Sequence, residues 1–374
     1  MRQRGHGWFG VAMALAAAAC GRPPAAEPAD GLLQRRELPL ASPSAHSDAP
    51  AARQKIQLDA RAMGTHMSFV ALTSPRCDEK ATRAAVEAAM NEIRRLELLM
   101  TTWRDDSEVS RINREAGKAP VPVSRETFEV IEKSLWMSER SEGVFDITFD
   151  VMRGLWRFDE NAVERVPAAR DIARLRSLID YRHVHTDREH TTVFLDRAES
   201  RLSLGGIAKG YAIDRAAAVL LGAGVDDFLA QAGGDLYVHG HKADGSPWVA
   251  GVRDPRGPAG AYFATMPVVD HAFSTAGDYE RAFVAKGRRY HHIIDPRTGY
   301  PATASRSVTI WAKDALTADA LDDAVFILGP EKGLALVESI EDAGAVIVDA
   351  KNQVHVSARL AGKVRVEHPP TDGT

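Results

Sequence analysis

Three aspartates close together near residue 320 have a spacing suited to metal binding. Asp319 and Asp323 are four residues apart, so on a helix they share one face, with Asp322 beside them. Clustered carboxylate oxygens suit a hard cation such as Mg²⁺, which keeps water and substrate phosphate in its coordination shell. The alternative is structural: if Thr317 caps the helix, acidic residues in the first turn stabilise the helix dipole. These residues alone leave both interpretations open.

The segment 202–210 (LSLGGIAKG) predicts a strand, a glycine turn and the start of a helix. Glycines such as Gly205 and Gly206 let the backbone approach a ligand closely, and free N–H groups at a helix start attract phosphate. Lys209 would add a charge-assisted contact to the same anion. A tight turn beside a solvated lysine explains the same residues, so the motif alone is weak.

The segment 291–299 (HHIIDPRTG) predicts a strand that runs into a Pro/Gly turn. On a strand His291 and His292 face opposite sides, so at most one of them points into a site. A packing histidine before a turn is the plainer interpretation. Two more turns of small residues lie at 231–235 (QAGGD) and 274–279 (STAGDY). Single turns of this kind are common, but four in one chain are not.

The elements expected around these segments come in blocks. The helix at 79–101 places Val86, Met90, Ile93 and Leu96 on one face, and Ser124 is a good N-cap for a second helix ending at Gly143. Because strands follow in hairpin-rich runs without strict βαβ alternation, the pattern favours an α+β fold. Further helices are expected at 207–221, after Thr317 and after Pro330, and strands at 56–73, 183–185, 191–196, 201–204, 228–231, 235–238, 248–252, 262–266, 290–294 and 307–311.

The first twenty residues are typical of a lipoprotein signal. Arg2 and Arg4 precede a short apolar run at 8–19, and Cys20 follows as the residue that would be lipidated. Leu15 lies five residues before the cysteine, where such signals usually place a leucine at three. The alternative is a cleaved signal with an incidental cysteine.

Residues 21–54 are rich in Pro and Ala and have no apolar period, so we expect an extended tether. A globular domain at 55–362 and a tail at 363–374 would follow. The expected product is exported, anchored to a membrane through lipid on Cys20, and faces the periplasm.

Charge and missing motifs exclude several classes of protein. Lys+Arg at 47 and Asp+Glu at 51 give a net charge of −4, which argues against a nucleic-acid partner. The chain lacks G-x-x-x-x-G-K-[ST], G-x-G-x-x-G, H-E-x-x-H and G-x-S-x-G. These absences disfavour a P-loop kinase, a Rossmann dehydrogenase, a zincin and a standard serine hydrolase.

Taken in order, these segments resemble the FAD:protein FMN transferases, the ApbE-like flavin transferase family. The similarity runs from about Met63 to Gly329. Further motifs that carry it are Met63-Gly64-Thr65, Trp103 to Asp106 with Ser107-Glu108 and Asn113, Phe145-Asp146-Ile147-Thr148, and Leu155-Trp156. The resemblance implies an α+β fold of largely antiparallel sheets and packed helices, with two lobes around a central FAD cleft.

The resemblance also implies roles for single residues. Met63 and Trp103 would flank the flavin ring, which needs flat or polarisable apolar partners. Mg²⁺ would be held by the backbone carbonyl of Gly206 and by Asp319 and Asp323. The other residues implied to line the FAD site are Val144, Phe145, Asp146, Ser203, Lys209, Ile293 and Asp322.

The implied reaction splits FAD and attaches its FMN half to another protein. Mg²⁺ would bridge the pyrophosphate and help AMP leave. A Ser or Thr hydroxyl of the client protein would attack the FMN phosphorus, and His292 or a nearby carboxylate would accept its proton. Two rivals keep the flavin site: a hydrolase that converts FAD to FMN and AMP, and a non-catalytic flavin-binding lipoprotein.

The chain departs from the family pattern at three positions. Asp323 replaces the usual Thr or Ser, Ser203 replaces the usual Asp, and Ala276 stands in the Thr-Ser-Gly turn. We hypothesise that the first two changes offset each other by moving one negative charge across the same site.

Overall fold

The computed structural model describes residues 53–158 and 165–373. The expected signal at 1–20, Cys20 and nearly all of the tether at 21–54 lie outside these residues and stay predictions. Within the two described ranges, no helix has the length and apolarity to cross a bilayer.

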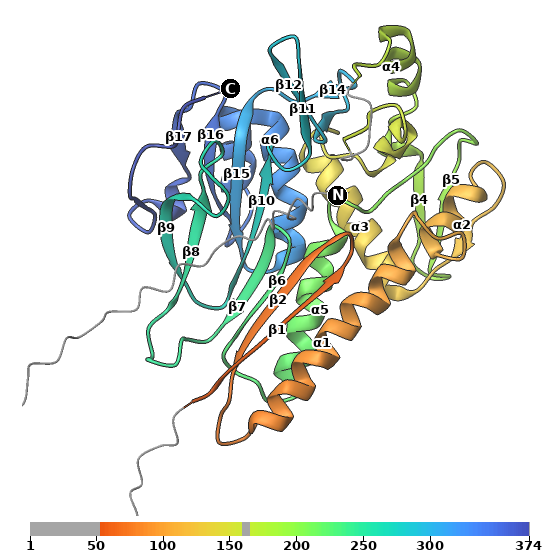
Figure 1. Ribbon diagram of the computed structural model, residues 1–374. Helices are drawn as coiled ribbons and strands as arrows, with labels where there is room; N and C mark the ends of the chain where they lie inside the picture. The colour runs from red at the N-terminus through yellow and green to blue at the C-terminus, as the bar shows by residue number, and fades with distance from the viewer. Residues whose placement is uncertain (1–52, 159–164, 374) are drawn as a thin grey trace, which may run out of the picture.

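An eight-stranded sheet forms the centre of the molecule (Figure 1). All its neighbouring strands are antiparallel, so alternate side chains face opposite sides. The strand order is β1 (Lys55–Ala62), β2 (Thr65–Leu72), β6 (Phe228–Ala232), β7 (Asp235–His239), β10 (His271–Gly277), β15 (Ser305–Ala312), β16 (Gly344–Asp349) and β17 (Val354–Val356).

Each face of this sheet is covered by a different layer. Helices α1 (Glu79–Met100), α5 (Ala208–Gly222) and α6 (Ala315–Glu338) pack on one face, where Phe69, Phe228 and Phe326 are fully buried. The other face packs on a small sheet of β8 (Trp248–Arg253), β9 (Tyr262–Val268) and β18 (Arg365–Val366). The fold is therefore α+β with antiparallel sheets, as predicted.

A region of shorter elements lies beside the helices (Figure 1). Ser124 caps α3 as predicted, because its side chain accepts a hydrogen bond from the Thr127 amide at 3.3 Å. The elements are α2 (Glu108–Arg114), β3 (Val121–Pro122), α3 (Arg125–Arg140), α4 (Ala169–Arg176), β4 (Val184–Asp187), β5 (Thr192–Leu195), β11 (Ala282–Ala285), β12 (Arg288–His291), β13 (Ile294–Asp295), β14 (Tyr300–Pro301) and the 3₁₀ turns η1 (Ile147–Met152) and η2 (Tyr181–His183). A further 3₁₀ turn, η3 (Ala358–Leu360), lies against β16, and its Leu360 packs in the core shared with the small sheet.

Helix α6 differs from the expectation. It begins at Ala315, because Asp314 is the N-cap and accepts a hydrogen bond from the Thr317 amide at 2.7 Å. The two helices expected after Thr317 and Pro330 are both present within α6, where Gly329, with a non-helical φ of 76°, separates them. The aspartates at 319–323 therefore lie beyond the first turn, which removes the helix-dipole explanation for them.

Two other segments differ as well. Residues 201–204 form no strand, because the side chain of Asn113 bonds both the amide and the carbonyl of Leu202, and the Ser203 amide donates to the Ile147 carbonyl. The segment 363–373, part of the expected tail, packs on the globular domain. Its strand β18 pairs with β9, and Thr371 Oγ1 donates to Asp254 at 2.6 Å.

Candidate active site

The glycine turn at 205–206 and helix α6 meet where α5 begins. A Cβ on Gly210 would come within 2.2 Å of the Ala315 carbonyl oxygen and 2.7 Å of Asp319 Cβ, so only glycine permits this approach. The Gly210 amide donates a hydrogen bond to Asp319 Oδ2 at 2.8 Å. This contact brings Lys209, the residue before Gly210, against the acidic face of α6.

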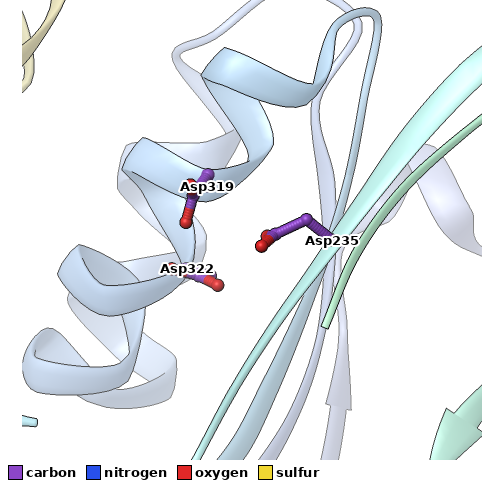
Figure 2. A group of neighbouring side chains, drawn as sticks. All are labelled: Asp235, Asp319 and Asp322. Carbon is purple, nitrogen blue, oxygen red and sulfur yellow. The ribbon is translucent and has the colours of Figure 1, made fainter. Parts of the chain in front are cut away.

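Three buried carboxylates converge at this contact (Figure 2). Asp319 and Asp322 come from α6 and Asp235 from the start of β7, with ligand oxygens within 4.8 Å of one another. Their exposed fractions are 2%, 5% and 1%. Ser274 Oγ lies 2.5 Å from Asp322 Oδ2 and also contacts Asp235 Oδ1. Since a hydroxyl carries one proton, it donates to only one of these carboxylates.

Lys209 is held inside this cluster. Its Nζ lies 2.7 Å from Asp235 Oδ2 and 3.1 Å from Asp319 Oδ1. Burial alone would lower the pKa of Lys209, but the charges of Asp235 and Asp319 raise it well above its ordinary value. Lys209 is therefore a permanent cation that two carboxylates already engage.

Asp323 lies against the glycine turn. A Cβ on Gly206 would be 3.0 Å from Asp323 Oδ2 and 3.8 Å from an edge carbon of the Phe145 ring. The structure thus brings together Gly206 and the acidic face of α6, as the predicted metal site requires.

The carboxylates carry more negative charge than Lys209 neutralises. Burial, together with the charges of neighbouring carboxylates, raises the pKa of Asp319 to about 6 and that of Asp323 to about 7. Burial and the charge of Asp323 also raise the pKa of Asp322 well above its usual range. A divalent cation would relieve this repulsion, and hard carboxylate oxygens are the ligands that Mg²⁺ prefers. The residues present therefore fit the implied metal.

Asp235 was missed as a candidate ligand in the sequence. It belongs to the tight carboxylate group, whereas the predicted ligand Asp323 lies outside that group and against Gly206. The sequence signal that could have indicated Asp235 was the glycine turn at 233–235. Gly233 has a φ of 63° there, and a Cβ on Gly233 would lie 2.7 Å from Thr65 Oγ1. That turn aims the first side chain of β7 toward α6.

His291 and His292 have different surroundings, but not because they alternate on one strand. The strand expected at 290–294 is broken: β12 ends at His291, β13 begins at Ile294, and His292 lies between them. His291 is 3% exposed, donates to the Ala302 carbonyl at 2.8 Å and packs edge-on against Phe326. The His292 amide donates to the Arg281 carbonyl at 3.1 Å, and its Nδ1 is buried with no hydrogen-bond partner among the described residues. Burial, and then the charge of Arg281, lower the pKa of His292 to about 3. His292 is thus a neutral imidazole.

The two residues expected to flank the flavin lie on loops. Met63 forms the β1–β2 turn with a φ of 51°, and a Cβ on the next residue, Gly64, would lie 4.0 Å from Arg281 Nη2. Trp103 is 86% exposed, and the Arg153 guanidinium lies 4.7 Å from its ring centre. An exposed indole of this kind is available to stack on a ligand.

The remaining predicted residues lie in the main core or make local hydrogen bonds near the glycine turn and η1. Val144 and Ile293 are buried in the main core. The Asp146 carboxylate accepts hydrogen bonds from the Thr148 amide at 2.8 Å and the Tyr181 amide at 2.8 Å, so it fixes the start of η1. Ser203 Oγ accepts from the Gly205 amide at 3.3 Å. Their contacts with FAD stay predictions.

Comparison with known proteins connects this geometry to a family. The model of the ApbE family matches residues 63–347. An FAD:protein FMN transferase of Treponema pallidum (strain Nichols) is 35% identical over 312 residues, which cover 78% of this chain and 85% of that protein. One from Vibrio cholerae serotype O1 is 30% identical over 289 residues, covering 76% of this chain and 85% of that protein.

Solved structures of ApbE proteins match this fold as well. The crystal structure of the ApbE protein from Thermotoga maritima matches with a TM-score of 0.75 at 33% identity, covering 83% of this chain and all of that chain. The apo form of the Pseudomonas stutzeri flavinyl transferase ApbE matches with a TM-score of 0.72 at 30% identity, covering 83% of this chain and 97% of that chain. Because the family model spans most of its residues, the chain belongs to the ApbE family.

Proposed function

We propose that this chain is an FAD:protein FMN transferase. The observation that carries the proposal is the contact between the acidic face of α6 and the glycine turn that opens α5, with Asp319 bonded to Lys209 and to the Gly210 amide. A turn of this kind suits a diphosphate, and the carboxylates suit the cation that accompanies it. The family and the names of the relatives support the same activity.

In the proposed reaction a Ser or Thr hydroxyl of a client protein attacks the FMN phosphorus of FAD. A new P–O bond forms to the client, the P–O–P bond breaks and AMP leaves. The hydroxyl proton passes to His292, which is neutral and has an unpartnered Nδ1 within the described chain. In this proposal FAD lies beside the glycine turn, with Met63 and Trp103 against its flavin ring.

The metal in this proposal is Mg²⁺, held by Asp319 and Asp322, with Asp235 in the same carboxylate group and Asp323 against Gly206. When bound, it would supply Lewis-acid stabilisation of the charge that develops on the diphosphate. The chain's own residues fix the geometry: Gly210 orients Asp319, and Ser274 orients Asp322.

The proposal also includes export and anchoring. Cleavage before Cys20, lipidation of its sulfur and a tether at 21–54 would hold the transferase domain near the periplasmic face of a membrane. Radiolabelled palmitate should enter the full chain in cells and be absent after Cys20→Ser. Equal labelling of both would contradict lipidation at this residue.

An incubation of the purified protein with FAD, Mg²⁺ and a small client domain tests the proposed function. We expect flavin fluorescence on the client in a denaturing gel. Free FMN and AMP without labelled client would indicate hydrolysis, and intact FAD would indicate a storage protein; either result contradicts the proposal.

A further inference from the structure

Arg281, next to the candidate base, is a cation whose side chain has no partner in the described part of the chain. Its side chain is exposed, and among the described residues it makes no hydrogen bond or ion pair. Its carbonyl accepts the His292 amide at 3.1 Å, and its Nη2 lies 4.0 Å from the position a Cβ on Gly64 would take. Arg281 therefore stands between the β1–β2 turn that carries Met63 and His292, which directly follows β12.

The backbone just before Arg281 is fixed by a buried ion pair, whereas the Arg281 side chain is exposed. Arg256 forms a two-pronged ion pair with Asp278 at 2.6 and 2.7 Å, and both side chains are about 10% exposed. The Asp278 amide donates to the Arg306 carbonyl at 3.1 Å. A buried bidentate pair of this kind fixes the chain three residues before Arg281. The guanidinium thus projects from a fixed anchor.

The substrate's charge makes this cation significant. Lys209 is already engaged by Asp235 and Asp319 at 2.7 and 3.1 Å, so it has little donor capacity left for a phosphate. A diphosphate that enters the site adds negative charge beside an acidic cluster. An arginine fork matches phosphate oxygens better than a lysine does, because it offers paired donors in one plane.

We propose that Arg281 binds the phosphate of the FMN half of the substrate, opposite the acidic cluster. This inference rests on the proposed function and adds a substrate-contacting residue to it. In that position the guanidinium donates hydrogen bonds to the phosphate oxygens and keeps the phosphorus that is attacked beside His292. It supplies the charged hydrogen bonds that Lys209, engaged by two carboxylates, is not free to donate.

Flavins with and without a phosphate test the proposal directly. Quenching of flavin fluorescence gives the affinity of wild-type protein, Arg281→Gln and Arg281→Lys for FMN and for riboflavin, in the presence of Mg²⁺. We expect Arg281→Gln to weaken FMN roughly tenfold or more and riboflavin less than about twofold, as the loss of a charged hydrogen bond predicts. Arg281→Lys should fall between, because it keeps the charge and loses the fork.

Arg288→Gln is the matched control. Arg288 is exposed at the far end of the β11–β12 hairpin, where it lies over the Tyr290 ring at 5.3 Å. The Arg288→Gln variant should bind both flavins as tightly as wild type does.

Equal weakening of FMN and riboflavin binding by Arg281→Gln, or unchanged FMN affinity, would overturn the proposal. Failure of client labelling with intact FMN discrimination would count against the proposed function alone, and wild-type protein that binds neither flavin would overturn both.

Discussion

The Gly210 amide donates a hydrogen bond to Oδ2 of Asp319 at 2.8 Å, and this contact joins the start of α5 to the acidic face of α6. It satisfies one of the free amides in the first turn of α5 with a carboxylate that also contacts Lys209. The interhelix packing and the candidate active site therefore depend on the same two residues.

Replacing Gly210 should damage both. In Gly210→Ala the added methyl would lie 2.2 Å from the Ala315 carbonyl oxygen, so the helices must move apart. We expect the free energy of unfolding in urea to fall by about 1–3 kcal/mol. Gly222→Ala in the same helix is the control and should be neutral or slightly stabilising, because no atom of the described residues outside the helix's own backbone lies within 4 Å of its Cβ position. Equal stability of the two variants would contradict the packing described.

Lys209 and Asp235 should show strong coupling. Lys209→Met leaves buried carboxylates without their cation, and we expect a loss of about 3–5 kcal/mol in metal-free buffer. Adding Asp235→Asn removes one of those charges, so the double variant should recover part of the loss in a double-mutant cycle. Strictly additive losses would show that the two side chains do not interact.

Stability should fall as the pH rises toward neutrality, in part because of Asp214. Its carboxylate accepts hydrogen bonds from the Ala315 and Leu316 amides at 2.8 and 2.9 Å, yet burial raises its pKa to about 7. A raised carboxyl pKa means that the folded state holds the proton more tightly, so this contribution is complete below about pH 4 and is lost as the pH passes 7.

Urea unfolding of wild type and Asp214→Asn between pH 4.5 and 8, with metal removed, checks this sign. The amide introduced by Asp214→Asn resembles the neutral acid that the folded state holds at low pH, so the two proteins should be closest in stability there. The stability of the variant should decline less with rising pH, by on the order of 1 kcal/mol or more. Parallel curves for the two proteins would rule Asp214 out as a source of the slope.

Ser203 and Asp323 flank the same glycine turn, which supports the idea that their departures from the family pattern offset each other. Ser203 Oγ lies 3.5 Å from the Cβ position of Gly205, and Asp323 Oδ2 lies 3.0 Å from that of Gly206. Asp323→Thr should weaken Mg²⁺ binding, measured by calorimetry, by more than Asp323→Thr combined with Ser203→Asp. Equal or weaker affinity in the double variant would remove the idea.

Local patterns predicted much of the fold. The apolar face of Val86, Met90, Ile93 and Leu96 gave α1 at 79–101, and the observed helix is Glu79–Met100. Capping was harder, because Asp314 and Thr317 are both good N-caps three residues apart and only the structure shows which one is used. The strand expected at 201–204 failed because its partner is Asn113, 89 residues from Leu202.

The candidate site was predictable only in part, for a similar reason. Asp319, Asp322, Asp323, Gly206 and Lys209 lie in two short segments, and their chemistry is visible locally. Asp235 joins them only because β7 pairs with β10 in the central sheet and α6 packs on that sheet, which is long-range information. The availability of Arg281 is likewise invisible in sequence, because it depends on which charges its neighbours already neutralise.

The rate of covalent flavin attachment to a client at saturating FAD and Mg²⁺ tests the central claim most directly. Wild-type protein and Asp342→Asn, an exposed position whose φ of 51° suits asparagine, should label the client equally fast. Asp319→Asn should be slower by about 100-fold or more, because it removes a proposed metal ligand that also contacts Lys209. Labelling by Asp319→Asn at the wild-type rate would contradict an active site built on the contact between α5 and α6.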